Sequence, residues 1–206
     1  MPLIATETAG SSFSPVPEGV HAAACCWLID CGTQHSEQFA KDARKLVIAF
    51  ELPEERIEID GEDKSRIISR QFTLSLHENA ALRAFLEAWR GKRFTAQELT
   101  GFDLHAVLGA PCQLQILHRE NQGKTFANIA SIMPKAKGAP LPNTEIDRVL
   151  FSIDDLDRNR SLVDQIPREL PEWISDLILC SAEARSWGKA AEPEQPAFNV
   201  DDEIPF

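Results

Sequence analysis

The sequence predicts a mainly β domain of the α+β class, with five strands closed into a barrel and a helical insertion between the third and fourth strands. Three observations support this class. Three strand-like apolar runs precede residue 77, a segment with helical periodicity follows, and two further strand-like runs return after it. A change of hydrophobic period from two to 3.6 and back marks the borders of such an insertion.

The first strand is expected over residues 21–31 (HAAACCWLIDC), a run of small and apolar residues. The second is expected over 45–52, where Pro53 should end it. Its residues alternate between two faces, one with Leu46, Ile48, Phe50 and Leu52 and the other with Val47, Ala49 and Glu51. A turn at Asp60-Gly61 then leads to a third strand over 67–76.

Residues 77–90 (HENAALRAFLEAWR) carry apolar side chains at helical spacing, and Gly91 stands where a helix should end. A short helix is expected over 95–100, because Thr95 and Glu98 fit the capping box, and another helical turn over 101–108. Strands four and five are expected over 112–118 and 125–133, joined by a hairpin loop at 120–123. The spacing of Phe50, Phe85 and Trp89 predicts core positions.

Three strands, a helical segment and two strands is the layout of the OB-fold, a five-stranded barrel. A generic α+β domain is the alternative. Residues 1–18 are expected to form an arm and 19–138 the barrel. Residues 139–187 form an extension with an edge strand over 148–153 and an additional C-terminal helix over 170–187, which packs on the barrel or on a second subunit.

The formal net charge of −11 is unevenly distributed. Residues 19–138 contain 15 Lys and Arg against 15 Asp and Glu, whereas residues 139–206 contain 6 against 15. The predicted barrel is therefore neutral, and it can bind nucleic acid only if its cations are grouped on one face. No run of 18 apolar residues and no signal peptide pattern is present, so a cytoplasmic location is expected.

Residues 188–200 are rich in Ala, Pro, Glu and Gln and predict a disordered tether. The chain then ends in an acidic cluster followed by an apolar tip, namely Asp201, Asp202, Glu203, Ile204, Pro205 and Phe206. Carboxylates suit a basic groove, and a terminal Phe supplies one apolar anchor. A frayed acidic terminus is the alternative.

This ending closely resembles the partner-recruiting tip of bacterial single-stranded DNA-binding proteins. The strings RKLVIAFELP, LRAFLEAWRGKRFT, LTGFDL and GKTFANIASIMPKAKG also resemble OB-fold DNA-binding proteins of phages and prophages, over residues 19–186. The resemblance implies an OB-fold that coats single-stranded DNA and a tail that recruits replication, recombination and repair enzymes. The helical insertion and extra helix depart from the housekeeping family, so a dimer is favoured over a tetramer.

Such binding needs exposed aromatic rings on which bases stack, with cations beside them for phosphates. Candidates on the predicted strands and loops comprise three aromatic and eight basic residues: Trp27, Phe72 and Phe126, with Lys41, Arg44, Lys45, Arg66, Arg70, Lys124, Lys135 and Lys137. Arg70 and Phe72 share a strand face by alternation. For each aromatic residue alone, a core position is the competing interpretation.

A metal site could in principle use Cys25, Cys26, Cys31 and His35, but their spacing forms no ligand pair, so buried thiols are expected instead. Asp154-Asp155 with Asp157 lacks the Gly and closing Glu of a calcium loop. Common catalytic motifs are absent, so neither a cofactor nor enzymatic activity is expected. The two competing functions are a protein-interaction adaptor whose barrel binds no DNA, and a small enzyme that uses the Cys/His cluster.

Overall fold

The computed structural model describes residues 14–37, 40–59 and 61–187. Most of its regular structure is β-strand: β1 (Gly19–Ser36), β2 (Lys41–Ile59), β3 (Glu62–Thr73), β4 (Pro111–Asn121), β5 (Lys124–Pro134) and β6 (Val149–Phe151). The α-helices are α1 (Ala81–Arg90), α2 (Ala96–Thr100), α3 (Glu172–Leu179) and α4 (Ala182–Arg185). Short 3-10 helices cover Leu104–Val107, Ile153–Asp155 and Val163–Gln165. The mainly β prediction, with helices between the third and fourth strands, is confirmed.

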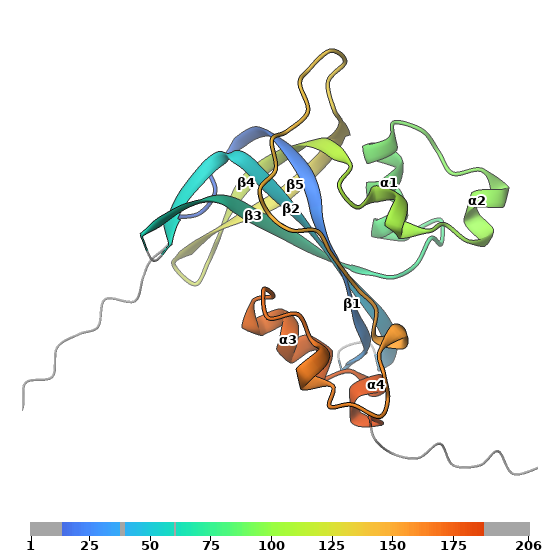
Figure 1. The fold of residues 1–206 in the computed structure, drawn as a ribbon. Helices are drawn as coiled ribbons and strands as arrows, with labels where there is room; N and C mark the ends of the chain where they lie inside the picture. Colours follow the sequence, from blue (N-terminus) through green and yellow to red (C-terminus); the bar gives the residue numbers. More distant parts are fainter. Residues whose placement is uncertain (1–13, 38–39, 60, 188–206) are drawn as a thin grey trace, which may run out of the picture.

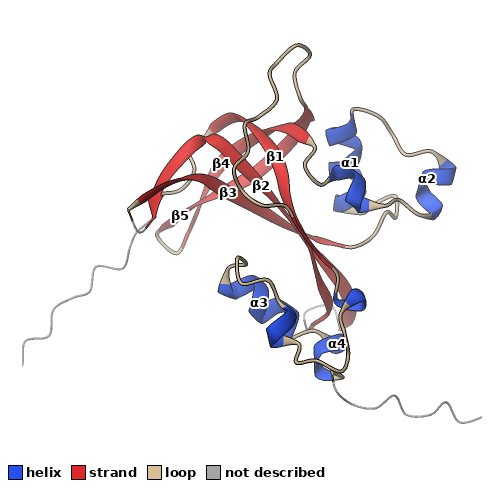
Figure 2. Cartoon of the chain, in the orientation of Figure 1, coloured by secondary structure: helices blue, strands red, loops and turns tan. Residues whose placement is uncertain are grey.

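The strands form one curved sheet in the order β3-β2-β1-β4-β5, with antiparallel neighbours throughout, and β6 pairs parallel with β1. The two edge strands, β3 and β5, lie close to each other. The Arg70 Nη1 on β3 donates a hydrogen bond to the Ile129 carbonyl on β5 at 3.1 Å. Figure 1 shows α1 and α2 at one side of the sheet and α3 and α4 beside the far end of β1. Figure 2 separates the same helices from the strands by colour.

The strands are longer than the apolar runs that predicted them. β2 continues past Pro53, so the prediction that this proline ends the strand is wrong. Its pairing with β3 shifts between Leu52 and Arg56, and such an irregularity accommodates a proline that cannot donate to the ladder. The hairpin between β4 and β5 is tight: Gln122 and Gly123 both have positive φ, at 50° and 73°, as a two-residue type I′ turn requires.

Both faces of the central strands are buried. One face of the curved sheet, which we call the inner face, contains Leu46, Ile48, Phe50 and Leu52, packed with α1 through Phe85 and Trp89. The opposite face contains Val47 and Ala49, packed under residues from 146 to 187. The predicted alternation in β2 and the predicted core positions of Phe50, Phe85 and Trp89 are confirmed. Alternation alone could not indicate that the second face is covered as well.

The C-terminal extension lies on the barrel of its own chain. β6 forms the predicted edge strand, but the predicted helix over 170–187 is divided into α3 and α4. Ser181 separates them, because its Oγ accepts the backbone N–H of Ala184 and so begins a new helix. Gly32 allows the close approach of α4: a Cβ at this position, where φ is +67°, would lie 2.6 Å from the Cβ of Ser181.

Residues 14–18, assigned to the arm by sequence, lie against the barrel. Val16 is buried in the inner core, and its carbonyl lies 2.8 Å from the His118 Nε2. The Glu18 carboxylate accepts the His118 backbone N–H at 2.7 Å. None of the helices in the described part of the chain is both long and apolar enough to cross a membrane.

Candidate functional site

The cysteines of β1 do not converge on one point. Cys25 lies in the inner core and Cys26 in the outer one, as predicted for neighbours on a strand. Burial is the largest cause that raises the pKa of the Cys25 and Cys31 thiols, each to about 12, so they are protonated at neutral pH. Among residues 14–37, 40–59 and 61–187, no three His, Cys, Asp or Glu side chains are grouped as metal ligands would be.

Two of the three predicted stacking residues are buried. Trp27 is 5% exposed, because β6 pairs beside it and the extension covers it. Phe72 is 3% exposed and packs against Phe85, with ring centroids 4.8 Å apart. The prediction that these two rings bind bases is therefore wrong. Arg70 does share a face with Phe72, but that face points into the barrel, where the guanidinium carbon lies 5.2 Å from the Phe72 centroid.

Several predicted phosphate contacts already have partners within the protein. Arg44 donates to Asp30 at 2.5 Å and to Asp154 at 2.6 Å, and these hydrogen bonds, first that to Asp30, raise its pKa. Arg66 donates to the Ser14 carbonyl at 2.5 Å. Lys45 Nζ lies 3.0 Å from the Thr73 hydroxyl. Lys41 is exposed at the start of β2, apart from the remaining candidates.

Of the other candidates, Lys124 and Phe126 lie at the start of β5, and Lys135 and Lys137 follow its end. The outward side chains of the β4 and β5 pair, which we call the hairpin face, are Gln113, Gln115, Leu117, Arg119 and Asn121 from β4 with Lys124, Phe126, Asn128, Ser131 and Met133 from β5. Arg119 lies directly opposite Phe126 in the register, and Lys124 lies opposite Asn121. Side chains at opposite positions of an antiparallel pair contact each other. A cation thus stands beside an exposed ring, and a second cation stands one pair further along.

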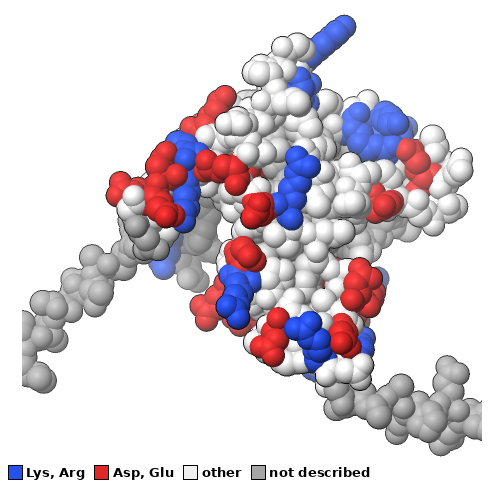
Figure 3. Space-filling model, in the orientation of Figure 1, with Lys and Arg blue, Asp and Glu red and all other residues white. Residues whose placement is uncertain are grey.

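The hairpin face has the composition that base stacking needs. Phe126 is 49% exposed and Leu117 is 45% exposed, which is unusual for side chains of this size. The ten residues of the face include two cations and no carboxylate. In contrast, Figure 3 shows both signs of charge mixed on the β2–β3 hairpin and on α3 and α4.

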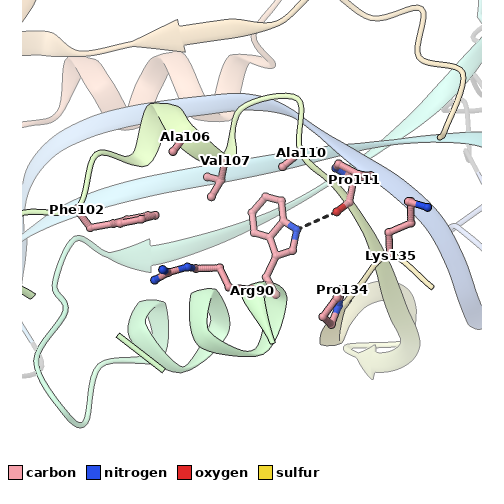
Figure 4. Close-up of a pocket in the computed structure, with 9 residues that line it drawn as sticks. Arg90, Phe102, Ala106, Val107, Ala110, Pro111, Pro134 and Lys135 are labelled. Carbon is pink, nitrogen blue, oxygen red and sulfur yellow. Dashed lines mark hydrogen bonds between the residues drawn. The ribbon is translucent and has the colours of Figure 1, made fainter. Parts of the chain in front are cut away.

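A pocket of about 400 Å³ opens where β5 ends. Its lining is mainly apolar: Trp89, Arg90, Phe102, Ala106, Val107, Ala110, Pro111, Pro134 and Lys135. Figure 4 shows Arg90 and Phe102 at one end and Pro134 and Lys135 at the other, with the indole N–H of Trp89 bonded to the Pro111 carbonyl at 3.2 Å. Lys137 is exposed in the loop that follows. Phe126 and this pocket therefore lie toward opposite ends of β5.

Charged groups hold the extension over the outer face of β1 and β2. Glu183 accepts hydrogen bonds from the backbone N–H and the hydroxyl of Thr33, both at 2.7 Å. Burial acts to raise the pKa of Glu183, but these bonds outweigh it and the pKa is lowered. The buried Glu51 carboxylate accepts the backbone N–H groups of residues 145 and 146 at 2.9 and 3.2 Å.

The residues predicted from the sequence include Phe126, Lys124, Lys135 and Lys137 but neither Arg119 nor the pocket. The loop was assigned to 120–123, whereas the turn comprises only Gln122 and Gly123. A two-residue turn fixes the register and would have placed Arg119 opposite Phe126. The predicted interaction tail, residues 201–206, lies outside the described residues.

No protein-family model matches the chain, and a search of curated proteins found no significant match.

Proposed function

We propose that this protein binds single-stranded DNA without sequence preference, on the hairpin face of an OB-type barrel, and recruits replication or repair proteins through its acidic C-terminal residues. The observation that carries the proposal is the pairing of a half-exposed Phe126 with Arg119 on a face that has no carboxylate. An aromatic platform beside cations is the arrangement on which bases stack while phosphates are neutralised.

The strand order supports an OB-type barrel. In that fold, five strands form a partly open barrel that binds oligonucleotides around its second and third strands. The order β3-β2-β1-β4-β5, with helices between β3 and β4, is compatible with it. The outer side of β2 is covered here by the extension, so we place the bound strand on β4 and β5 instead. β5 offers it a track of 11 residues, or about 36 Å.

The acidic ending supports the second half of the proposal. Like charge repels residues 201–206 from DNA and attracts them to a basic groove on another protein. We expect the same residues to compete weakly for the barrel when DNA is absent. Removing them should then leave the DNA affinity equal or higher and abolish partner binding, whereas a truncated protein with weaker DNA affinity would contradict this competition.

Fluorescence anisotropy of labelled oligo(dT), titrated with the full chain at low and moderate salt, tests the DNA-binding function. We expect binding that weakens steeply with salt, and much weaker binding of a duplex of equal length. Absence of binding at low salt, with and without residues 201–206, would reject the function.

A protein-interaction adaptor is the second candidate. Val20, Leu117 and Met133 join Phe126 as exposed apolar side chains on the outer side of β1, β4 and β5. A patch of this kind also marks protein interfaces. If oligo(dT) is not bound, a partner protein on this face becomes the working function.

A further inference from the structure

We propose that the pocket at the end of β5 holds a single unstacked base of the bound strand. This inference rests on the proposed function and adds a second contact, distinct from stacking on Phe126. Bases of single strands are commonly splayed out into protein pockets, where rings pack on their faces and polar groups contact their edges.

The walls of the pocket suit a flat apolar ring. Phe102 is partly buried and packs edge to face on Phe94, with centroids 5.0 Å apart. Ala106 and Ala110 are small residues that leave space beside it. The volume of about 400 Å³ falls within the range of small-molecule sites, roughly 300 to 1,000 Å³.

Arg90 supplies a guanidinium group to the wall of the pocket. Its guanidinium carbon lies 4.4 Å from the Phe94 centroid and 5.0 Å from that of Phe102, and its Nη2 pairs with Glu98. Its Nη1 is buried and has no hydrogen-bond partner among the described residues. The guanidinium belongs to a residue that lines the pocket, so it places a flat cation beside an inserted base.

The charges around the pocket favour an anionic ligand, such as a nucleotide, over a neutral one. The neighbouring carboxylates are engaged: Glu87 accepts the Phe94 backbone N–H, and Glu98 accepts that of Thr95. These bonds are the largest cause of the lowered pKa of each carboxyl. In contrast, the lining of the pocket contains two cations, Arg90 and Lys135, and no carboxylate. Phosphates on either side of an inserted base would neutralise them.

The test fills the pocket and varies the probe. Ala106→Phe places a ring in the space that the base would occupy, and Ala106→Met is a smaller filler. Oligo(dT) and an abasic strand of equal length serve as probes. We expect Ala106→Phe to weaken oligo(dT) binding about five- to tenfold, Ala106→Met to weaken it less, and neither to change abasic-strand binding by more than about twofold. Ala96→Phe, at an exposed position of α2 outside the pocket, is the control and should bind as the wild type does.

The outcomes separate this inference from the function beneath it. If the wild type does not bind oligo(dT), the proposed function fails. If the wild type binds and Ala106→Phe binds equally well, the function stands and the base pocket is rejected. Equal weakening of oligo(dT) and the abasic strand by Ala106→Phe would also reject it, because the ring would then block the backbone. Unchanged thermal unfolding midpoints show that the variants are folded.

Discussion

The outer face of the sheet has two halves, one buried under the extension and one exposed. Over β1 and β2, Ile29 and Val47 are buried under Ile174 and Ile178 of the extension. Over β4 and β5, Leu117 and Phe126 have no cover in the described part of the chain. The sheet covers one half of its outer face with its own chain and leaves large apolar groups exposed on the other, which is compatible with the proposal that the uncovered half binds a ligand.

The covered half also explains why the charge of the sequence did not show which cations are available to a ligand. The sequence predicts Arg44 as a phosphate contact, but in the structure it forms an ion pair with Asp154 of the extension. Arg44 on the covered half thus binds the protein itself, whereas Arg119 and Lys124 on the hairpin face form no ion pair in the described part of the chain. The net charge of residues 19–138 is neutral because it adds both kinds of cation, paired and unpaired, to the acidic residues.

The largest difference between the halves is expected in stability. Ile174→Ala should lower the free energy of unfolding by about 2 to 5 kcal/mol, because it opens a cavity in the outer core. Leu117→Ala, on the hairpin face, should change it by less than about 0.5 kcal/mol. Urea denaturation of both variants checks this. Equal losses would mean that the hairpin face is structurally covered after all.

The same comparison predicts which exposed ring binds DNA. Phe126→Ala should weaken oligo(dT) binding about tenfold, since stacking contributes about 1 to 3 kcal/mol per base. Trp173→Ala removes a ring of similar exposure, 47%, from α3 on the covered side and should leave the affinity unchanged. Anisotropy titrations distinguish them. If only Trp173→Ala lowered the affinity for oligo(dT), the binding face would be the covered half and not the hairpin face.

The salt dependence of oligo(dT) binding reports the contribution of the cations separately from that of stacking. A variant with Arg119→Gln and Lys124→Gln should reduce the slope of log affinity against log salt by about 1.4, which corresponds to two phosphate contacts on a single strand. Arg160→Gln with Arg168→Gln removes the same charge from exposed positions of the extension and is the control. Equal slopes for both double variants would show only a general charge effect.

The smallest effect concerns the contacts that hold the extension. The Glu183 pKa is lowered by folding, so its contribution to stability is present above the ordinary Glu pKa of about 4.3 and is lost as pH falls through the lower folded value. Glu183→Gln should therefore cost less than about 1 kcal/mol at pH 7, and the difference from wild type should shrink below about pH 4. Unfolding curves at pH 7 and pH 3.5 test this, and a difference that grows on acidification would contradict it.

Alternation and breaker residues predicted much of the fold from sequence. The two faces of β2 and the helix end at Gly91 agree with the expected positions. The candidate site was harder to predict, because exposure depends on distant parts of the chain. Nothing local in CCWLI indicates that Trp27 lies under residues that follow some 120 positions later. Phe126 and Trp27 are both aromatic residues on predicted strands. They differ in exposure because the extension covers Trp27 and does not cover Phe126.

Glu51 has a consequence for the order of events during synthesis. Its buried carboxylate is satisfied by backbone groups of residues 145 and 146, which lie beyond the predicted barrel boundary at 138. A chain still emerging from the ribosome would hold this carboxylate without those partners, and the outer side of β2 would be bare. We therefore expect the barrel to reach its final stability only after the extension has been translated, although its strands come first.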